Sequence, residues 1–222
     1  MRRRRRDERG ATAVEAALVT PLLVLLVFGM IEMAFLLRDY AVVTSNTRTG
    51  ARVAATGAAA GPAVDCTGDT TAPCSPNTVP ALAQMAADAI QRSGSAMPAE
   101  NIDRIAVYQA NDRGLPGTAT QMATTDDLCQ GAANCVTYTW RPDPAPATTG
   151  RFRYTSGTWP SAQISACFPG TAAAPLHRVG VAMQATHPMT TGLFGDGITL
   201  RQYTTMNFEP LPTQSCKANQ HQ

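Results

Sequence analysis

The chain has 222 residues, of which 44% are hydrophobic and 15% are charged. This length allows one modest globular domain besides a membrane segment, and it excludes a large multidomain enzyme. The formal net charge of +2 hides an asymmetry, because residues 1–10 hold six of the 18 basic and two of the 16 acidic residues. The other residues carry 12 basic and 14 acidic side chains, so the rest of the chain is close to neutral.

An uncharged apolar run extends over Ala16–Ile31 and, if Glu32 is tolerated, reaches Leu37. As a helix this run would be about 33 Å long, which is enough to cross the ~30 Å hydrocarbon core of a bilayer. A secretory signal peptide usually has a shorter apolar core and ends at a small-residue cleavage site, whereas this run continues into Arg38. We therefore expect a retained transmembrane helix over residues 11–37.

The basic residues at the N-terminus predict the orientation of this helix. Arg2–Arg6 and Arg9 all precede it, and Arg side chains next to a membrane segment resist translocation. Residues 1–10 are thus expected to be a cytoplasmic leader of a single-pass membrane protein, with residues 61–222 as an extracytoplasmic domain. Arginine runs also bind nucleic acid, but beside a membrane span they are typically topogenic, so no nucleic-acid partner is expected.

The residues from Arg9 to Glu15 resemble the cleavage motif of prepilin-like proteins. In that family a membrane aspartyl peptidase cuts after a glycine that ends a short basic leader. The resemblance implies that Gly10 ends the leader, that Ala11 becomes the new N-terminus, and that Glu15 is the acidic fifth residue of the mature chain. The carboxylate of Glu15 would then attract the freed α-amino group of a neighbouring subunit. The alternative is that Glu15 merely lies in the first helical turn, where the helix dipole favours an acid.

A longer pattern, GATAVEAALVTPLLVLLVFGMIEMAFLLRDYAVVTSNTRTGARVAA, resembles the TadE-like family, the minor pseudopilin-like proteins of tight-adherence (Flp) pilus systems. Three features in order carry the resemblance: Val-Glu followed by Pro21 and a Leu-rich helix, the segment Phe28–Glu32, and the segment Asn46–Ala55. Many prepilins have an aromatic residue at the mature N-terminus or sixth position, where this chain has Ala11 and Ala16. The family resemblance implies a pilin-like fold, with a prepilin-type peptidase, other pilin-like subunits and the pilus assembly machinery as partners.

Beyond the membrane the helix is expected to continue over residues 38–60 and to end at Gly57, Gly61 and Pro62. Small residues recur on one narrow face of this continuation, which suits close packing against a sheet or another helix. They are Val43, Thr47, Gly50, Ala51 and Ala54. Arg48 and Arg52 would share the adjoining side, either as a solvated or headgroup-facing surface or as a contact between subunits.

All six cysteines follow the predicted membrane helix, at Cys66, Cys74, Cys129, Cys135, Cys167 and Cys216. An even number on the oxidising side of a membrane predicts disulfides, although six cysteines allow 15 pairings. The short intervals favour Cys66 with Cys74 and Cys129 with Cys135, which leaves Cys167 with Cys216. These intervals are wider than the usual spacing of structural zinc ligands, so no metal is expected.

The remaining pattern predicts an α+β fold similar to pilin-like proteins. A second helix is expected over Pro80–Gly94, and about four antiparallel strands are expected from alternating or β-branched segments. The extended candidates are Ile102–Gln109, Cys135–Arg141, Val179–Thr186 and Ile198–Phe208, with a short hairpin over Arg151–Trp159 that turns at Ser156-Gly157. The long N-terminal helix would pack on this small sheet beside the second helix, with disulfide-linked loops.

No pattern predicts an enzyme or a cofactor. His177, His187 and His221 are not in a metal-binding spacing, and neither a nucleophile elbow nor a Walker or dinucleotide loop is present. Asp126-Asp127 is typical of a turn or helix cap rather than of an acid–base pair. Gly195-Asp196-Gly197 lacks the strand-to-helix context that cradles phosphate.

The sequence therefore predicts a non-enzymatic, membrane-anchored minor pilin-like subunit that takes part in pilus assembly. The alternative is an uncleaved single-span envelope protein whose outer domain binds a partner or a surface ligand. A membrane-tethered enzyme with an unrecognised site is a third possibility, which would require activity in the outer domain. Processing and assembly experiments separate the first two possibilities, and an activity assay of the outer domain tests the third.

Overall fold

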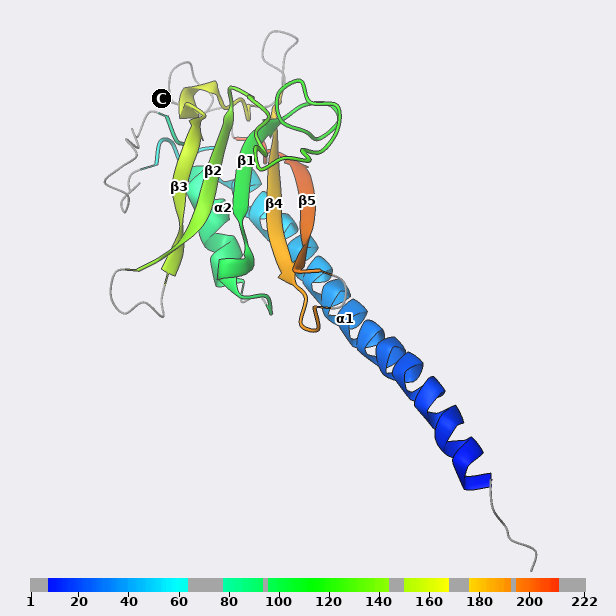
Figure 1. The fold of residues 1–222 in the computed structure, drawn as a ribbon. Coiled ribbons are helices and arrows are strands. Elements are labelled where there is room, and N and C mark those ends of the chain that lie inside the picture. The colour runs from blue at the N-terminus through cyan, green and yellow to red at the C-terminus, as the bar shows by residue number, and fades with distance from the viewer. Residues whose placement is uncertain are drawn as a thin grey trace, which may run out of the picture.

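The computed structural model describes residues 8–63, 78–93, 96–143, 150–167, 176–192 and 195–211. Within these residues two α-helices precede and pack on a five-stranded antiparallel sheet (Figure 1). The elements are α1 (Glu8–Thr56), α2 (Ala81–Arg92), β1 (Arg104–Ala110), β2 (Cys135–Pro142), β3 (Gly150–Thr158), β4 (Arg178–Pro188) and β5 (Gly197–Asn207), with short 3-10 helices η1 (Ala99–Asn101) and η2 (Ser161–Gln163). The α+β class predicted from the sequence is confirmed.

Helix α1 is a single element of 49 residues, about 73 Å long at 1.5 Å per residue. Its N-terminal part projects away from the sheet, and its C-terminal part packs against α2, β4 and β5 (Figure 1). The predicted continuation beyond the apolar run is confirmed, although the helix ends at Thr56 rather than near residue 60. A turn follows at Gly57, where the chain passes so close to α2 that a Cβ would lie 2.9 Å from the Cβ of Leu82.

The sheet has the strand order β3-β2-β1-β4-β5, so β1 and β4 are neighbours although β2 and β3 lie between them in the chain. All four pairings are antiparallel, and the β4–β5 pairing is the longest, from Arg178–Asn207 to Pro188–Gly197. This hairpin therefore extends beyond the other strands toward the projecting part of α1 (Figure 1).

The predicted hairpin over Arg151–Trp159 is wrong. Residues 150–158 form one strand, β3, which pairs with β2 over its whole length, including Gly157 opposite Val136. Gly157 has φ +92°, so the Ser-Gly pair that suggests a turn instead lies within an irregular strand. The register of the β2–β3 pairing shifts close by, between Thr137 and Tyr138 of β2. The backbone freedom of glycine is used here within a ladder rather than at its end.

The two faces of the sheet have separate apolar contacts. Ile105, Val107, Val181 and Met183 share the main core with α1 and α2, since alternate residues of a strand point to one face. On the opposite face, Ala106, Tyr108 and Ala182 pack with residues of the β1–β2 connection, including Leu128. The sheet is thus covered by both helices on one side and by this connection on the other.

The β1–β2 connection is closed by a disulfide between Cys129 and Cys135, one of the predicted pairs. Cys167 is also disulfide-bonded. Cys66, Cys74 and Cys216 lie outside the described residues, so the pairing of Cys66 with Cys74 and of Cys167 with Cys216 stays a prediction. Leu211 pairs with Cys167 through an isolated bridge, which brings the chain shortly before Cys216 to that position.

Replacing both Cys129 and Cys135 with Ser should lower the free energy of unfolding by about 2 kcal/mol, because the bridge closes only a short loop in the unfolded chain. Urea denaturation of the full chain in detergent measures this difference. The double replacement avoids leaving one thiol unpaired. An unchanged midpoint of unfolding would show that this bridge does not stabilise the fold.

Candidate functional site

The projecting part of α1 exposes large apolar side chains around its whole circumference. The exposed residues there include Val14, Leu18, Val19, Leu22, Leu23, Leu25, Leu26, Met30, Ile31 and Leu37. A helix that is apolar on every side and not covered by protein is typical of a membrane span. Within the described ranges, α1 is the one helix long and apolar enough to cross a membrane.

The predicted processing residues lie at the beginning of this helix. Gly10 and Ala11 belong to the first turn of α1, which begins at Glu8, and Glu15 follows one turn later with an exposed side chain. Glu15 therefore lies on the surface of the apolar helix, in the part that projects away from the sheet (Figure 1). Cleavage after Gly10 and the attraction of Glu15 to a neighbouring subunit stay predictions.

A group of four polar residues, three of them buried and one half-buried, lies where α1 meets the sheet. Sequence reasoning missed this group. We call Glu32, Asp39, His187 and Thr191 the neck cluster. Glu32 is only 2% exposed, and its Oε1 accepts hydrogen bonds from the backbone N–H of Thr191 at 2.7 Å and from the Thr191 hydroxyl at 3.0 Å. Its Oε2 is buried and has no hydrogen-bond partner in the described part of the chain.

Seven residues after Glu32 on α1, Asp39 forms a buried pair with His187 of β4. His187 Nδ1 lies 2.7 Å from Asp39 Oδ2, and both side chains are almost fully buried. Arg38, which is half exposed, donates to the other oxygen, Oδ1, at 3.1 Å. Because an ionised carboxylate only accepts hydrogen bonds, we place the proton of the imidazole on Nδ1.

A periodic signal in the sequence could have revealed the neck cluster. Glu32, Asp39 and Asn46 are seven residues apart, so they share one face of a helix. Asn46 is also buried, and its Oδ1 accepts a hydrogen bond from the Ser93 hydroxyl at 2.9 Å. This polar row runs beside the predicted small-residue face, whose five members are all buried. The N-terminal end of the packed face is therefore polar, whereas its C-terminal end is apolar and small.

The other residues singled out in the sequence have structural surroundings. Arg48 and Arg52 are exposed on α1. Asp127 Oδ1 accepts the backbone N–H of Cys129 at 3.1 Å, as expected for a residue that orders a turn. Asp126 Oδ1 accepts a hydrogen bond from Gln184 Nε2 of β4 at 2.9 Å.

Of the three histidines, His187 alone belongs to the neck cluster. His177 Nδ1 accepts the backbone N–H of Ser165 at 3.2 Å, and partial burial lowers the pKa of His177. His221 lies outside the described residues. Among the residues that the structure describes, no group of three or more His, Cys, Asp or Glu side chains could hold a metal ion.

Residues 10–52 match a family model described as TadE-like protein. This match confirms the resemblance suggested by the N-terminal pattern, and it covers α1 from Gly10 through most of its packed part. It indicates a protein associated with a tight-adherence pilus system. No curated protein and no solved structure matches the chain.

Proposed function

We propose that this protein is a minor pilin-like subunit that takes part in the assembly of a tight-adherence (Flp) pilus. The observation that carries the proposal is the TadE-like match over residues 10–52, which includes both Gly10 and Glu15. The fold supports it, because the matched residues form one helix whose exposed apolar part leads directly into a packed globular part. No catalytic or cofactor-binding residue is part of the proposal.

The proposed mechanism begins with cleavage between Gly10 and Ala11 by a prepilin-type peptidase at the cytoplasmic face. Proteases generally bind their substrates in extended form, so the first turn of α1 must unwind locally. Gly10 lowers the cost of this unwinding, because glycine is about 1 kcal/mol less favourable than alanine in a helix. The same residue lets the protease approach the backbone closely.

After cleavage the α-amino group of Ala11 and the carboxylate of Glu15 would mediate recruitment. Glu15 is exposed on an apolar helix, and a carboxylate at this depth is expensive to leave unpaired. The α-amino group of a neighbouring subunit supplies an opposite charge, which would set the register between two helices as they leave the bilayer. The exposed apolar side chains of α1 would then exchange contacts with lipid for contacts with other subunits.

The first test is the N-terminal sequence and intact mass of the protein recovered from its own host's membranes. A chain that begins at Ala11 supports the assembly role. A chain that still carries Met1 and the arginine run would contradict processing. It would favour the alternative, an uncleaved single-span envelope protein with a partner-binding outer domain.

Replacing Glu15 with Gln is expected to abolish or strongly reduce pilus assembly while the protein still inserts into the membrane. Gln is close to Glu in size, so the change removes the negative charge and little else. Pilus recovery from the cell surface and membrane fractionation measure the two properties separately. Glu8→Gln is the matched control, because it removes the same charge from the leader that cleavage discards. Normal pili in the Glu15 variant would contradict the proposed mechanism.

A further inference from the structure

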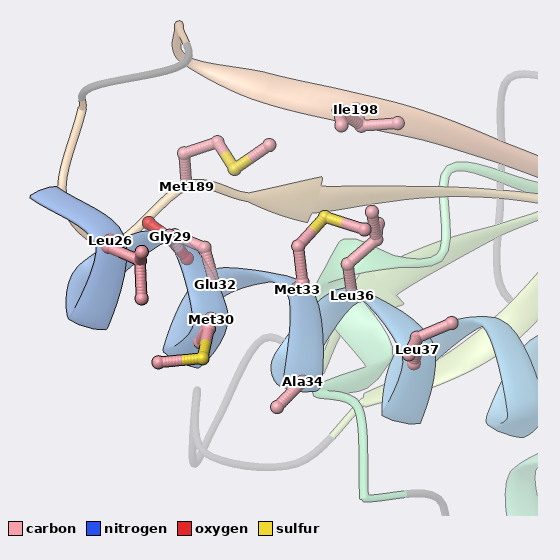
Figure 2. Close-up of a pocket in the computed structure, with 10 residues that line it drawn as sticks. All are labelled: Leu26, Gly29, Met30, Glu32, Met33, Ala34, Leu36, Leu37, Met189 and Ile198. Carbon is pink, nitrogen blue, oxygen red and sulfur yellow. The ribbon is translucent and has the colours of Figure 1, made fainter.

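The end of the β4–β5 hairpin lies against the apolar part of α1 and not only against its packed part. Figure 2 shows Met189, just after β4, and Ile198 of β5 above the helical residues from Leu26 to Leu37. Thr191, in the same connection, donates its two hydrogen bonds to Glu32 of the helix. The hairpin is thus attached to a helical segment that the sequence places within the membrane.

A groove of about 620 Å³ lies between the helix and the hairpin. Its walls are apolar side chains, chiefly Leu26, Met30, Met33 and Leu37 of α1 with Met189 and Ile198 of the hairpin (Figure 2). The one carboxylate in the lining, Glu32, has its Oε1 engaged by Thr191, and its Oε2 is buried. The groove therefore offers an occupant almost only apolar contacts.

The depth of the groove follows from helix geometry. The apolar run begins at Ala16. If Ala16 lies at the cytoplasmic edge of the hydrocarbon core, Glu32 is about 24 Å further along the helix axis, within the outer leaflet of a ~30 Å core. Arg38 and the exposed Tyr40 then lie at the outer headgroup level, where basic and aromatic residues are typical. Met30 and Met33 fall within the outer leaflet, about 21 and 26 Å from that edge.

The burial of Glu32 agrees with this depth. A carboxylate that faced acyl chains from the surface of the helix would be expensive. The hairpin removes that cost by covering the side chain and donating two hydrogen bonds to it. To do so, the hairpin end must itself lie at the level of the outer leaflet.

We propose that the end of the β4–β5 hairpin is a second membrane-contact element, and that the groove between Met189, Ile198 and α1 holds an acyl chain of an outer-leaflet phospholipid. The inference rests on the membrane span in the proposed function. Lipid is the occupant because the groove is continuous with the lipid-facing surface of α1, lies at the depth of the acyl chains and has apolar walls. The protein then contacts the membrane at two places, through the span of α1 and through the end of the β4–β5 hairpin.

Photo-crosslinking tests the proposal with a matched pair of positions. A benzophenone amino acid replaces Ile198, which is 37% exposed on the hairpin, or Met85, which is 38% exposed on α2. After irradiation of the full chain in its host's membranes, mass spectrometry measures phospholipid adducts. We expect the lipid adduct at position 198 to exceed that at position 85 at least several-fold. A probe at Met189 gives a second measurement if the Ile198 replacement disturbs the hairpin.

A third probe, at the exposed residue Leu18, separates this inference from the proposed function. Lipid adducts at Leu18 without adducts at Ile198 or Met189 would overturn the inference and leave the membrane span in place. Adducts at Ile198 or Met189 to a protein, such as a second copy of this chain, in place of lipid would also overturn it. An absence of lipid adducts at Leu18 would overturn the span and with it the inference.

Discussion

Replacing Asp39 with Ala should lower the free energy of unfolding by about 3 kcal/mol, the upper end of the usual cost of leaving a buried donor without its acceptor. The change leaves His187 Nδ1 without its acceptor inside a buried site, where water cannot easily replace the carboxylate. It also removes the acceptor of Arg38. Urea or thermal denaturation of the full chain in detergent measures the loss.

The control is Asp112→Ala, which removes an equally short contact, an ion pair with Arg178, from an exposed position. Arg178 Nη2 lies 2.7 Å from Asp112 Oδ1, the same distance as in the buried pair, but the Asp112 side chain is fully exposed. Surface pairs contribute little to stability, so this variant should unfold almost like the parent chain. Equal losses in the two variants would show that burial of Asp39 does not decide its contribution.

The pair can also be tested by a double-mutant cycle. If Asp39 and His187 stabilise the junction through each other, the variant with both residues replaced by Ala should lose less stability than the sum of the two single variants. Additive losses would show that each side chain acts independently of the other.

Replacing Gly157 with Ala should cost about 4 kcal/mol of folding free energy. About 1–3 kcal/mol comes from placing a side chain at positive φ, and about 1–3 kcal/mol from crowding. The added Cβ would lie 2.1 Å from the carbonyl oxygen of Cys135 and 3.1 Å from Cα of Val136, both backbone atoms of the paired strand β2. Neither can move without disturbing the ladder.

Gly131→Ala separates strain from crowding. Gly131 has φ +72°, and among the described residues a Cβ there meets no heavy atom within 4 Å. This variant should therefore retain only the cost of strain. Denaturation curves of the two variants, compared with the parent chain, give the difference. If both variants lose the same stability, the clash with β2 is not real.

The elements with a strong local signal could be predicted from the sequence. The apolar run and the uninterrupted helical residues after it predict α1, since neither a stop signal nor a glycine turn occurs before Gly57. The second helix is also confirmed, as Ala81–Arg92, because its apolar spacing is regular. The Cys129–Cys135 bridge follows from the short interval between the two residues.

The strand over residues 150–158 shows where local patterns were misleading. Ser156-Gly157 is a good turn sequence, but β2 offers pairing partners along the whole segment, and Gly157 pairs with Val136 at its positive φ. Long-range pairing therefore overrode the local preference. The residues of this segment alone cannot reveal the pairing, because the partner strand β2 is a separate segment of the chain.

The sequence by itself determined the long helix, its apolar N-terminal part with the Gly10–Glu15 motif, and the α+β class, because these depend on residues close together in the chain. Only the tertiary structure decided the neck cluster. Glu32 and Asp39 are 159 and 148 residues from Thr191 and His187. On the helix alone Glu32 and Asp39 would be exposed charges. They become buried because β4 and its connection to β5 return to α1. Burial, which decides the energy of a charge, depends on that return.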